Sequence, residues 1–208
     1  MISYTLVSNN VIDGNRTDVV RHGLSSSDPN FAGMVTSSLL LPNFNLFVYD
    51  LNSAAVIVSQ TSLTVSKGSL VGATYTLVLN SQPTSGGLVI VNMVCSDPTK
   101  LMTVPASVGI RSTNWQVAQI ITVLGINNYK VDGNTPLTIT HTLTSTTDPP
   151  YNNLTTNVPS VSVMVLDTDV AVFSTSVTTM SVTKTLDLIP YTVKLSTIPY
   201  YPVTVRGR

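Results

Sequence analysis

Few side chains in this 208-residue sequence have the chemistry for acid–base, nucleophilic or metal-assisted catalysis. All ten acidic residues are aspartates, and the remaining candidates are His22, His141 and Cys95. Neither histidine has a second histidine, a cysteine or a glutamate at the spacing of metal ligands. Cys95 is distant from both histidines along the chain, so a nucleophilic Cys–His pair is not expected either. The sequence therefore predicts no enzyme and no cofactor, and both histidines are interpreted as polar residues of strands.

The charge balance excludes several kinds of partner. Lysine and arginine together number ten, as the aspartates do, so the formal net charge is zero, and charged residues make up only 10% of the chain. Without a long basic run, binding to nucleic acid or to an anionic membrane surface is not expected. Apolar residues alternate with serine and threonine, and no run of about 18 apolar residues could span a bilayer. We therefore expect neither a nucleic-acid partner nor membrane insertion.

The abundance of β-branched and hydroxyl residues predicts the fold class. Threonine and serine number 30 and 24, whereas glutamate, a good helix former, is missing. β-branched residues favour strands, and a chain poor in helix formers disfavours helices. Because Cys95 is the only cysteine, no disulfide within the chain can hold the fold together. An all-β protein with a hydrophobic core is expected.

Two pairs of segments align with each other and indicate an internal repeat. Residues 10–48 align with 128–165, and residues 63–89 align with 180–205. The matched positions include Asp13 with Asp132, His22 with His141, Phe31 with Tyr151, Lys67 with Lys184, and Tyr75 with Tyr191. The offsets of 116 to 120 residues correspond to the size of one β-sandwich domain.

This alignment divides the chain into one complete and two partial repeats. Residues 51–169 form the complete repeat, with strands expected at 54–66, 73–80, 87–94, 104–111, 117–125, 135–146 and 158–167. Residues 1–50 align only with the last three of these strands, and residues 170–208 only with the first three. Three strands cannot cover both faces of a sandwich, so each partial repeat is expected to leave apolar side chains uncovered.

The order of the motifs resembles the Calx-β-like, immunoglobulin-type repeats of large extracellular proteins. The resemblance covers nearly the whole chain. It rests on the runs at 62–68, 73–83 and 121–125, on Asn114-Trp115, and on Asp132-Gly133-Asn134. It implies tandem β-sandwiches and an extracellular or cell-surface location, although the segment after Met1 lacks the basic and apolar regions of a signal peptide. The same sandwich serves many functions, so the fold alone names none.

Members of this family often bind calcium where one repeat meets the next, through a glutamate after the first strand and aspartates near later strands. The resemblance places Lys67, and Lys184 in the partial repeat, where the family has the glutamate. The remaining calcium candidates are Asp132, Asp167, Asp169, Asp13 and Asp50. Calcium takes six to eight oxygen ligands, and an ammonium group opposes it, so no metal is expected.

Two interpretations of Lys67 remain open from the sequence. In the first, its ammonium group replaces the ion at the joint between repeats and faces Asp132, Asp167 or Asp169. In the second, Lys67 is a solvated lysine of an exposed turn, which contributes little to stability. The same choice applies to Lys184 at the aligned position.

The expected function is structural, as a repeat unit of an extracellular filament, appendage or surface stalk. The two partial repeats complement each other, either between separate subunits joined head to tail or between neighbouring repeats of one longer polypeptide. One alternative is an adhesin or carbohydrate-binding repeat, for which clustered Tyr191, Tyr200 and Tyr201 would form a platform. Another is a calcium-dependent linker. Asn15 and Asn153 begin acceptor sequences for N-glycosylation, so glycans are expected there in a glycosylating pathway.

Overall fold

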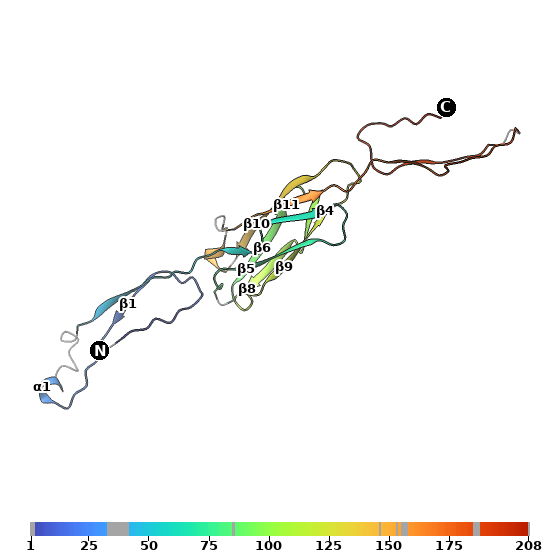
Figure 1. The fold of residues 1–208 in the computed structure, drawn as a ribbon. Coiled ribbons are helices and arrows are strands. Elements are labelled where there is room, and N and C mark those ends of the chain that lie inside the picture. Colours follow the sequence, from blue (N-terminus) through green and yellow to red (C-terminus); the bar gives the residue numbers. More distant parts are fainter. Residues whose placement is uncertain are drawn as a thin grey trace.

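A computed structural model describes residues 3–32, 42–84, 86–145, 147–152, 154, 158–184 and 188–207. Residues 51–169 form a β-sandwich, and a narrow ribbon extends from each of its two opposite ends (Figure 1). In the described residues, the helical elements are α1 (Pro29–Ala32) and the 3₁₀ turn η2 (Pro149–Tyr151), so the all-β prediction is confirmed. No helix in this part of the chain is long and apolar enough to cross a membrane.

The sandwich is built from a five-stranded and a four-stranded sheet. The first has the order β4 (Ser62–Ser66), β11 (Val161–Leu166), β10 (Thr135–Ser145), β6 (Leu88–Cys95) and β8 (Ser107–Arg111). The second has the order β3 (Val56–Val58), β5 (Ala73–Leu79), β9 (Gln119–Gly125) and β7 (Leu101–Val104). Neighbouring strands are antiparallel except for the parallel pair β4 and β11, which joins the beginning of the repeat to its end.

Alternating apolar residues hold the two sheets together. Tyr75, Leu77 and Leu79 of β5 point inward, as do Val89 and Val91 of β6. Each is essentially buried and belongs to one core cluster that includes side chains of both sheets. Burying a side chain of this size stabilises a fold by about 1.5–3 kcal/mol. The period-two pattern of the sequence therefore produces a core within residues 51–169.

Two of the expected strands are not single continuous strands in the structure. The range 54–66 contains β3 and β4, and these lie in opposite sheets. The expected strand 104–111 is also incomplete, because the chain forms β7 at residues 101–104 and then continues as β8 in the other sheet. Pro105 lies between β7 and β8 and has no N–H to donate, so the chain can leave one ladder there and join another. The predictions of single strands were therefore wrong at these two places.

Each ribbon contains two strands rather than the three that the alignment predicts. In the N-terminal ribbon β1 (Arg16–Val20) pairs with β2 (Phe44–Val48), and in the C-terminal ribbon β12 (Phe173–Thr175) pairs with β13 (Val193–Leu195). Residues 3–9, 179–184 and 202–207 form no strand, although they align with β9, β4 and β6. In the complete repeat those three strands pair with strands of the opposite half. Their counterparts lack such partners, and an unpaired backbone does not hold a strand.

Candidate functional site

A buried lysine lies at the end of the sandwich from which the C-terminal ribbon extends. Lys67 follows β4 directly, and its side chain is only 1% exposed. Its backbone N–H donates to the Leu166 carbonyl at 3.0 Å, and it forms a parallel bridge with Gly125. A Cβ at Gly125 would come within 2.8 Å of the Ser66 carbonyl oxygen, so only glycine allows this approach. The backbone thus fixes Lys67 between β9 and β11.

The three N–H donors of the Lys67 ammonium are all used. They donate to Asn128 Oδ1 at 3.0 Å, to the Lys130 carbonyl at 2.9 Å, and to Asp132 Oδ1. The three acceptors lie on the loop between β9 and β10. A buried ammonium is costly unless it is paired and hydrogen-bonded, and here both conditions hold.

Two further carboxylates complete the surroundings of the ammonium. Asp167 Oδ1 lies 3.2 Å and Asp169 Oδ2 lies 3.5 Å from Lys67 Nζ, both on the segment that follows β11. The structure therefore brings together Lys67 and the three aspartates that the resemblance places around it. Because the side chain is buried, the interpretation of Lys67 as a solvated lysine is wrong. We call this arrangement the Lys67 site.

The loops hold the carboxylates of the Lys67 site in place. Asp167 Oδ2 accepts the backbone N–H groups of Asp132 and Gly133, at 2.7 and 2.6 Å. Asp167 Oδ1 accepts the N–H of Asp169 at 2.9 Å. Lys100, at the start of the β7 edge, adds a second cation 3.0 Å from Asp132 Oδ2. No motif indicated Lys100, because its partner lies 32 residues further along the chain.

The electrostatics favour the ionised forms of this cluster. Burial is the largest influence on the pKa of Lys67 and would lower it, but the hydrogen bond to Asp132, the close contact with Asp167 and the negative charges of both raise that pKa above its ordinary value. The hydrogen bond from Lys67 brings the pKa of Asp132 well below its usual range. Backbone hydrogen bonds, chiefly from Asp169, lower the pKa of Asp167. Lys67, Asp132 and Asp167 are thus charged at neutral pH.

The residues of the Lys67 site do not fit a calcium ion. The Lys67 nitrogen lies where a cation would have to sit, within 3.5 Å of oxygens from all three aspartates. Calcium requires an oxygen at each ligand position and is repelled by an ammonium group. Among the residues that the structure describes, no group of three or more His, Cys, Asp and Glu side chains is placed to hold a metal.

The N-terminal ribbon repeats the carboxylate arrangement. Asp50 Oδ2 accepts the backbone N–H groups of Asp13 and Gly14, both at 2.8 Å. The Asp50 N–H in turn donates to Asn15 Oδ1 at 2.8 Å. The aligned atoms of residues 51–169 make the same three hydrogen bonds, at distances between 2.6 and 2.9 Å. We call this second arrangement the Asp13–Asp50 site.

The Asp13–Asp50 site differs from the Lys67 site in its cations. Among the described residues no lysine reaches it, and the nearest cation is Arg16, 3.6 Å from Asp13 Oδ2. Asn52 stands at the position of Asp169, and its Nδ2 donates to the Val11 carbonyl at 3.0 Å. A hollow of about 410 Å³ lies over Asp13 and Asp50. The carboxylates are therefore arranged as in the Lys67 site, but without a lysine.

The C-terminal ribbon repeats the other half of the sandwich. Phe173 pairs with Leu195 in the register that Val56 and Leu79 show in the complete repeat. A hydrogen bond that connects each repeat to the preceding one recurs as well. The Ile198 N–H donates to the Tyr129 carbonyl at 2.7 Å, and the aligned Gln82 N–H donates to the Asn10 carbonyl at 2.6 Å. These recurrences support the repeat alignment independently of sequence similarity.

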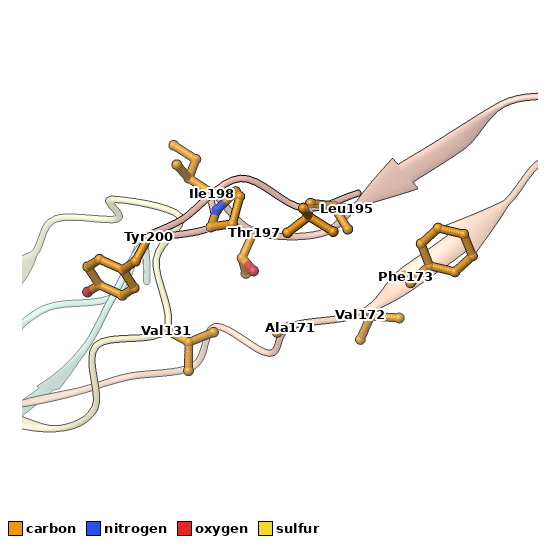
Figure 2. A pocket seen from close by; sticks show the side chains of 10 residues that line it. Val131, Ala171, Val172, Phe173, Leu195, Thr197, Ile198 and Tyr200 are labelled. Carbon is orange, nitrogen blue, oxygen red and sulfur yellow. The ribbon is translucent and has the colours of Figure 1, made fainter. Parts of the chain in front are cut away.

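An apolar pocket of about 310 Å³ lies where the C-terminal ribbon leaves the sandwich. Figure 2 shows Val131 of the sandwich facing side chains from both strands of the ribbon. The lining is Val131, Ala171, Val172, Phe173, Leu195, Thr197, Ile198, Pro199, Tyr200 and Val203. At the aligned place in the complete repeat, Tyr151 is buried in the core, and its hydroxyl donates to the Ser81 carbonyl at 2.6 Å.

The two histidines have structural surroundings. His141 Nδ1–H donates to the Pro159 carbonyl at 2.6 Å, so Nε2 is the acceptor for the Tyr75 hydroxyl at 2.8 Å. His22 Nδ1–H makes the aligned bond, to the Pro42 carbonyl at 2.6 Å. In the described residues, neither ring belongs to a group of three or more His, Cys, Asp and Glu side chains that could hold a metal. His141 lies on β10, as the sequence predicted, whereas His22 lies two residues after the end of β1, so the prediction of a strand residue was wrong for His22.

Burial of His141 predicts that the sandwich loses stability at mildly acidic pH. Burial lowers the pKa of His141 below 6.5, so beneath that pH the unfolded chain binds a proton that the folded chain does not. Stability then falls as the pH drops from 6.5 toward the lowered pKa, by at most about 1.4 kcal/mol per pH unit. Urea unfolding at pH 7, 6 and 5 measures the slope. We expect His141→Gln to flatten it; equal slopes in the original chain and in His141→Gln would contradict the prediction.

The remaining candidate residues are the cysteine, the tryptophan, the two possible glycosylation sites and Lys184. Cys95 carries a free, half-buried thiol whose pKa is raised by burial, and Trp115 packs against the core. Asn15 lies on the exposed N-terminal ribbon, whereas Asn153 lies outside the described residues. Lys184 is exposed and makes no ion pair with any described residue.

Comparison with known proteins does not place the chain in a family. No family model and no curated protein matches it. The Escherichia coli chaperone DraB aligns over 57% of this chain and 58% of its own, with 10% identity and a TM-score of 0.37. WR4, a C. elegans MSP family member, aligns over 55% of this chain and 98% of its own, with 8% identity and a TM-score of 0.34. Neither likeness carries an argument about function, and the description of the fold rests on the two sheets themselves.

Proposed function

We propose that this chain is a structural repeat unit of an extracellular filament, appendage or surface stalk. In this proposal, neighbouring copies join head to tail, and each joint completes one β-sandwich from two partial repeats. The extracellular setting rests on the resemblance to Calx-β-like repeats. The assembly rests on the surfaces of the two ribbons.

A single observation carries the proposal: core positions of the complete repeat are exposed in the ribbons. Val65 and Tyr75 are 5% and 1% exposed, whereas the aligned Val182 and Tyr191 are 66% and 51% exposed. In the same way, Tyr151 is fully buried and the aligned Phe31 is 48% exposed. Large apolar surfaces of this kind mark sites of association in soluble proteins. The side chains of each ribbon are thus those of a core that lacks its other half.

The placement of the two ribbons favours a linear assembly. They extend from opposite ends of the sandwich (Figure 1), and they align with opposite halves of it. A contact between the C-terminal ribbon of one copy and the N-terminal ribbon of the next joins different surfaces, so it does not close by two-fold symmetry. Such a contact repeats along an axis and builds a filament. Strands added from the neighbouring copy would also provide hydrogen-bonding partners for the open edges of each ribbon.

Assembly of the purified chain tests the proposal. We expect light scattering to rise with concentration and electron microscopy to show end-to-end strings of particles. A chain lacking residues 1–50 and a chain lacking residues 170–208 should each stay monomeric and should form only heterodimers when mixed, because each retains one ribbon. Full-length chains that remain dispersed monomers at every concentration would contradict the proposal.

The alternatives have less support from the geometry. An adhesin would bind sugar through polar groups beside an aromatic platform, but the pocket beside Tyr200 is lined almost entirely by apolar side chains. At the Lys67 site, a calcium-dependent linker would need oxygens around a free position, and the Lys67 ammonium occupies that position. Both observations favour packing between copies over binding of a small ligand.

A further inference from the structure

We propose that the joint between two copies is built from three specific contacts in the register of the complete sandwich. Lys184 of one copy enters the Asp13–Asp50 site of a second copy, Tyr191 bonds to the second copy's His22, and the second copy's Phe31 fills the apolar pocket. This inference rests on the proposed function and goes beyond it, because it assigns a ligand to each open site. The occupant in every case is a second copy of this chain.

The Lys67 site supplies the evidence for the Lys184 contact. Lys67 aligns with Lys184, and its three aspartate neighbours align with Asp13, Asp50 and Asn52. Asp132 Oδ1 binds the Lys67 ammonium, whereas Asp13 Oδ1 accepts no hydrogen bond from any described residue. Arg16 lies 3.6 Å from Asp13 but 3.3 Å from Asp18, so the two carboxylates of the site retain negative charge that a lysine would offset. The exposed Lys184 has the matching charge and no ion-pair partner of its own among the described residues.

The proposed contact between Tyr191 and His22 also has a counterpart in the complete repeat. In the complete repeat, His141 Nδ1 is held by a proline carbonyl, and Nε2 accepts the hydroxyl of Tyr75 at 2.8 Å. His22 is held in the same way by Pro42, at the same distance of 2.6 Å. The residue that aligns with Tyr75 is Tyr191, on the C-terminal ribbon. Each ribbon therefore carries one member of a pair that is buried together in the complete repeat.

The apolar pocket accounts for the third contact. In the complete repeat, Tyr151 of η2 is buried and reaches Ser81, and the aligned residues are Phe31 of α1 and Thr197 of the pocket wall. Figure 2 shows Thr197 and Leu195 beside the open space that the lining encloses. Phe31 lacks the tyrosine hydroxyl, which suits a pocket whose walls are mainly apolar. Burial of such a ring provides apolar area for association.

The parallel pair of β4 and β11 fixes the register. Thr64 lies opposite Met164 in that pair, and both side chains point outward. The aligned residues are Ser181 of one copy and Phe47 of the next. In this register Met180 and Val182 face inward, next to the inward side chains of β2. A register shifted by one residue would turn these apolar side chains outward. That shift is unfavourable because it would expose to solvent the side chains that belong in the core.

Disulfide cross-linking tests the register in the full chain. In a Cys95→Ser background, Ser181→Cys with Phe47→Cys places the two Cα atoms within bonding range across neighbouring strands. We expect oxidised glutathione to produce a ladder of covalent multimers on non-reducing gels. The matched control is Ser181→Cys with Asn45→Cys, which is two residues out of register and beyond the disulfide limit of about 7 Å between Cα atoms. A ladder from the control alone, or from neither pair although filaments form, would overturn the inference.

A second measurement tests the Lys184 contact. Lys184→Met leaves two carboxylates without their cation at the joint, and we expect the association constant to fall about 100-fold or more. Lys194→Met removes an exposed lysine from the outward face of β13 and should leave association unchanged. Filaments that form equally with both variants would reject the Lys184 contact while the proposed function stands. If no chain assembles at all, the proposed function fails first, and this inference fails with it.

Discussion

Replacing Lys67 with methionine is expected to lower the free energy of unfolding of the sandwich by about 3–5 kcal/mol. The substitution leaves Asp167 and Asp169 without a cation in a site where their side chains are almost buried. Asp132 keeps Lys100 as a partner 3.0 Å away, so one of the three carboxylates still has a cation beside it. Removing one member of a buried charged cluster costs more than the cluster itself contributes, because the remaining charges stay buried. Urea unfolding at neutral pH gives the value.

The aligned lysine provides the matched control. Lys184→Met changes the same type of residue at the same position of the repeat, but Lys184 is exposed and unpaired within the described chain. Measured at a concentration where the chain is monomeric, this variant should unfold within about 0.5 kcal/mol of the original. Equal stability of the two methionine variants would show that burial of Lys67 contributes nothing.

The pH dependence should separate the Lys67 site from other sources of stability. The pKa of Asp132, lowered chiefly by Lys67, and that of Asp167, lowered chiefly by backbone hydrogen bonds, are both below their usual 3.8. Their contribution is present above that pH and is lost as the pH falls through the lowered values. In Lys67→Met the lowering of the Asp132 pKa is reduced, so the loss of stability on acidification should be smaller and should be complete at a higher pH.

The sequence was sufficient for the fold class, because the fold class depends on local patterns. Alternation of apolar residues identified the sandwich, and the repeated Asp-Gly-Asn and His positions identified the period. The change of sheet between β3 and β4 could not be read in this way. It depends on which neighbour each strand meets, and both segments have the same strand-like composition.

The candidate site was predictable only in part, for a related reason. The resemblance placed Lys67 among aspartates that follow it by 65 to 102 residues, and no spacing rule connects such distant positions. Lys100 was missed because it belongs to no motif, although its ammonium lies 3.0 Å from Asp132. The missing third strand of each ribbon was also unexpected. Its hydrogen-bonding partners lie in the opposite half of the repeat, and the residue pattern of a single strand does not show that it depends on them.

Replacing Lys67 with glutamate is expected to make the sandwich depend on calcium. Four carboxylates would then surround one position together with Asn128 Oδ1 and the Lys130 carbonyl, which matches the six to eight oxygens that calcium takes. Without calcium, repulsion between the like charges should destabilise the fold by more than the methionine substitution does. Calcium at 100 times its Kd should return about 2.7 kcal/mol of stability. Thermal unfolding with and without calcium measures both effects.

Three controls test whether the calcium response comes from the substituted site. The original chain should not respond to calcium, because its ammonium group already occupies the centre of the oxygen set. Magnesium should restore less stability, since it demands a smaller octahedral site and retains its water. Adding Asp169→Asn to Lys67→Glu should weaken the calcium response by removing one of the four carboxylates. A calcium response in the original chain as large as in Lys67→Glu would mean that the lysine does not stand in the place of an ion, and the joints between copies would then have to be explained by metal binding instead.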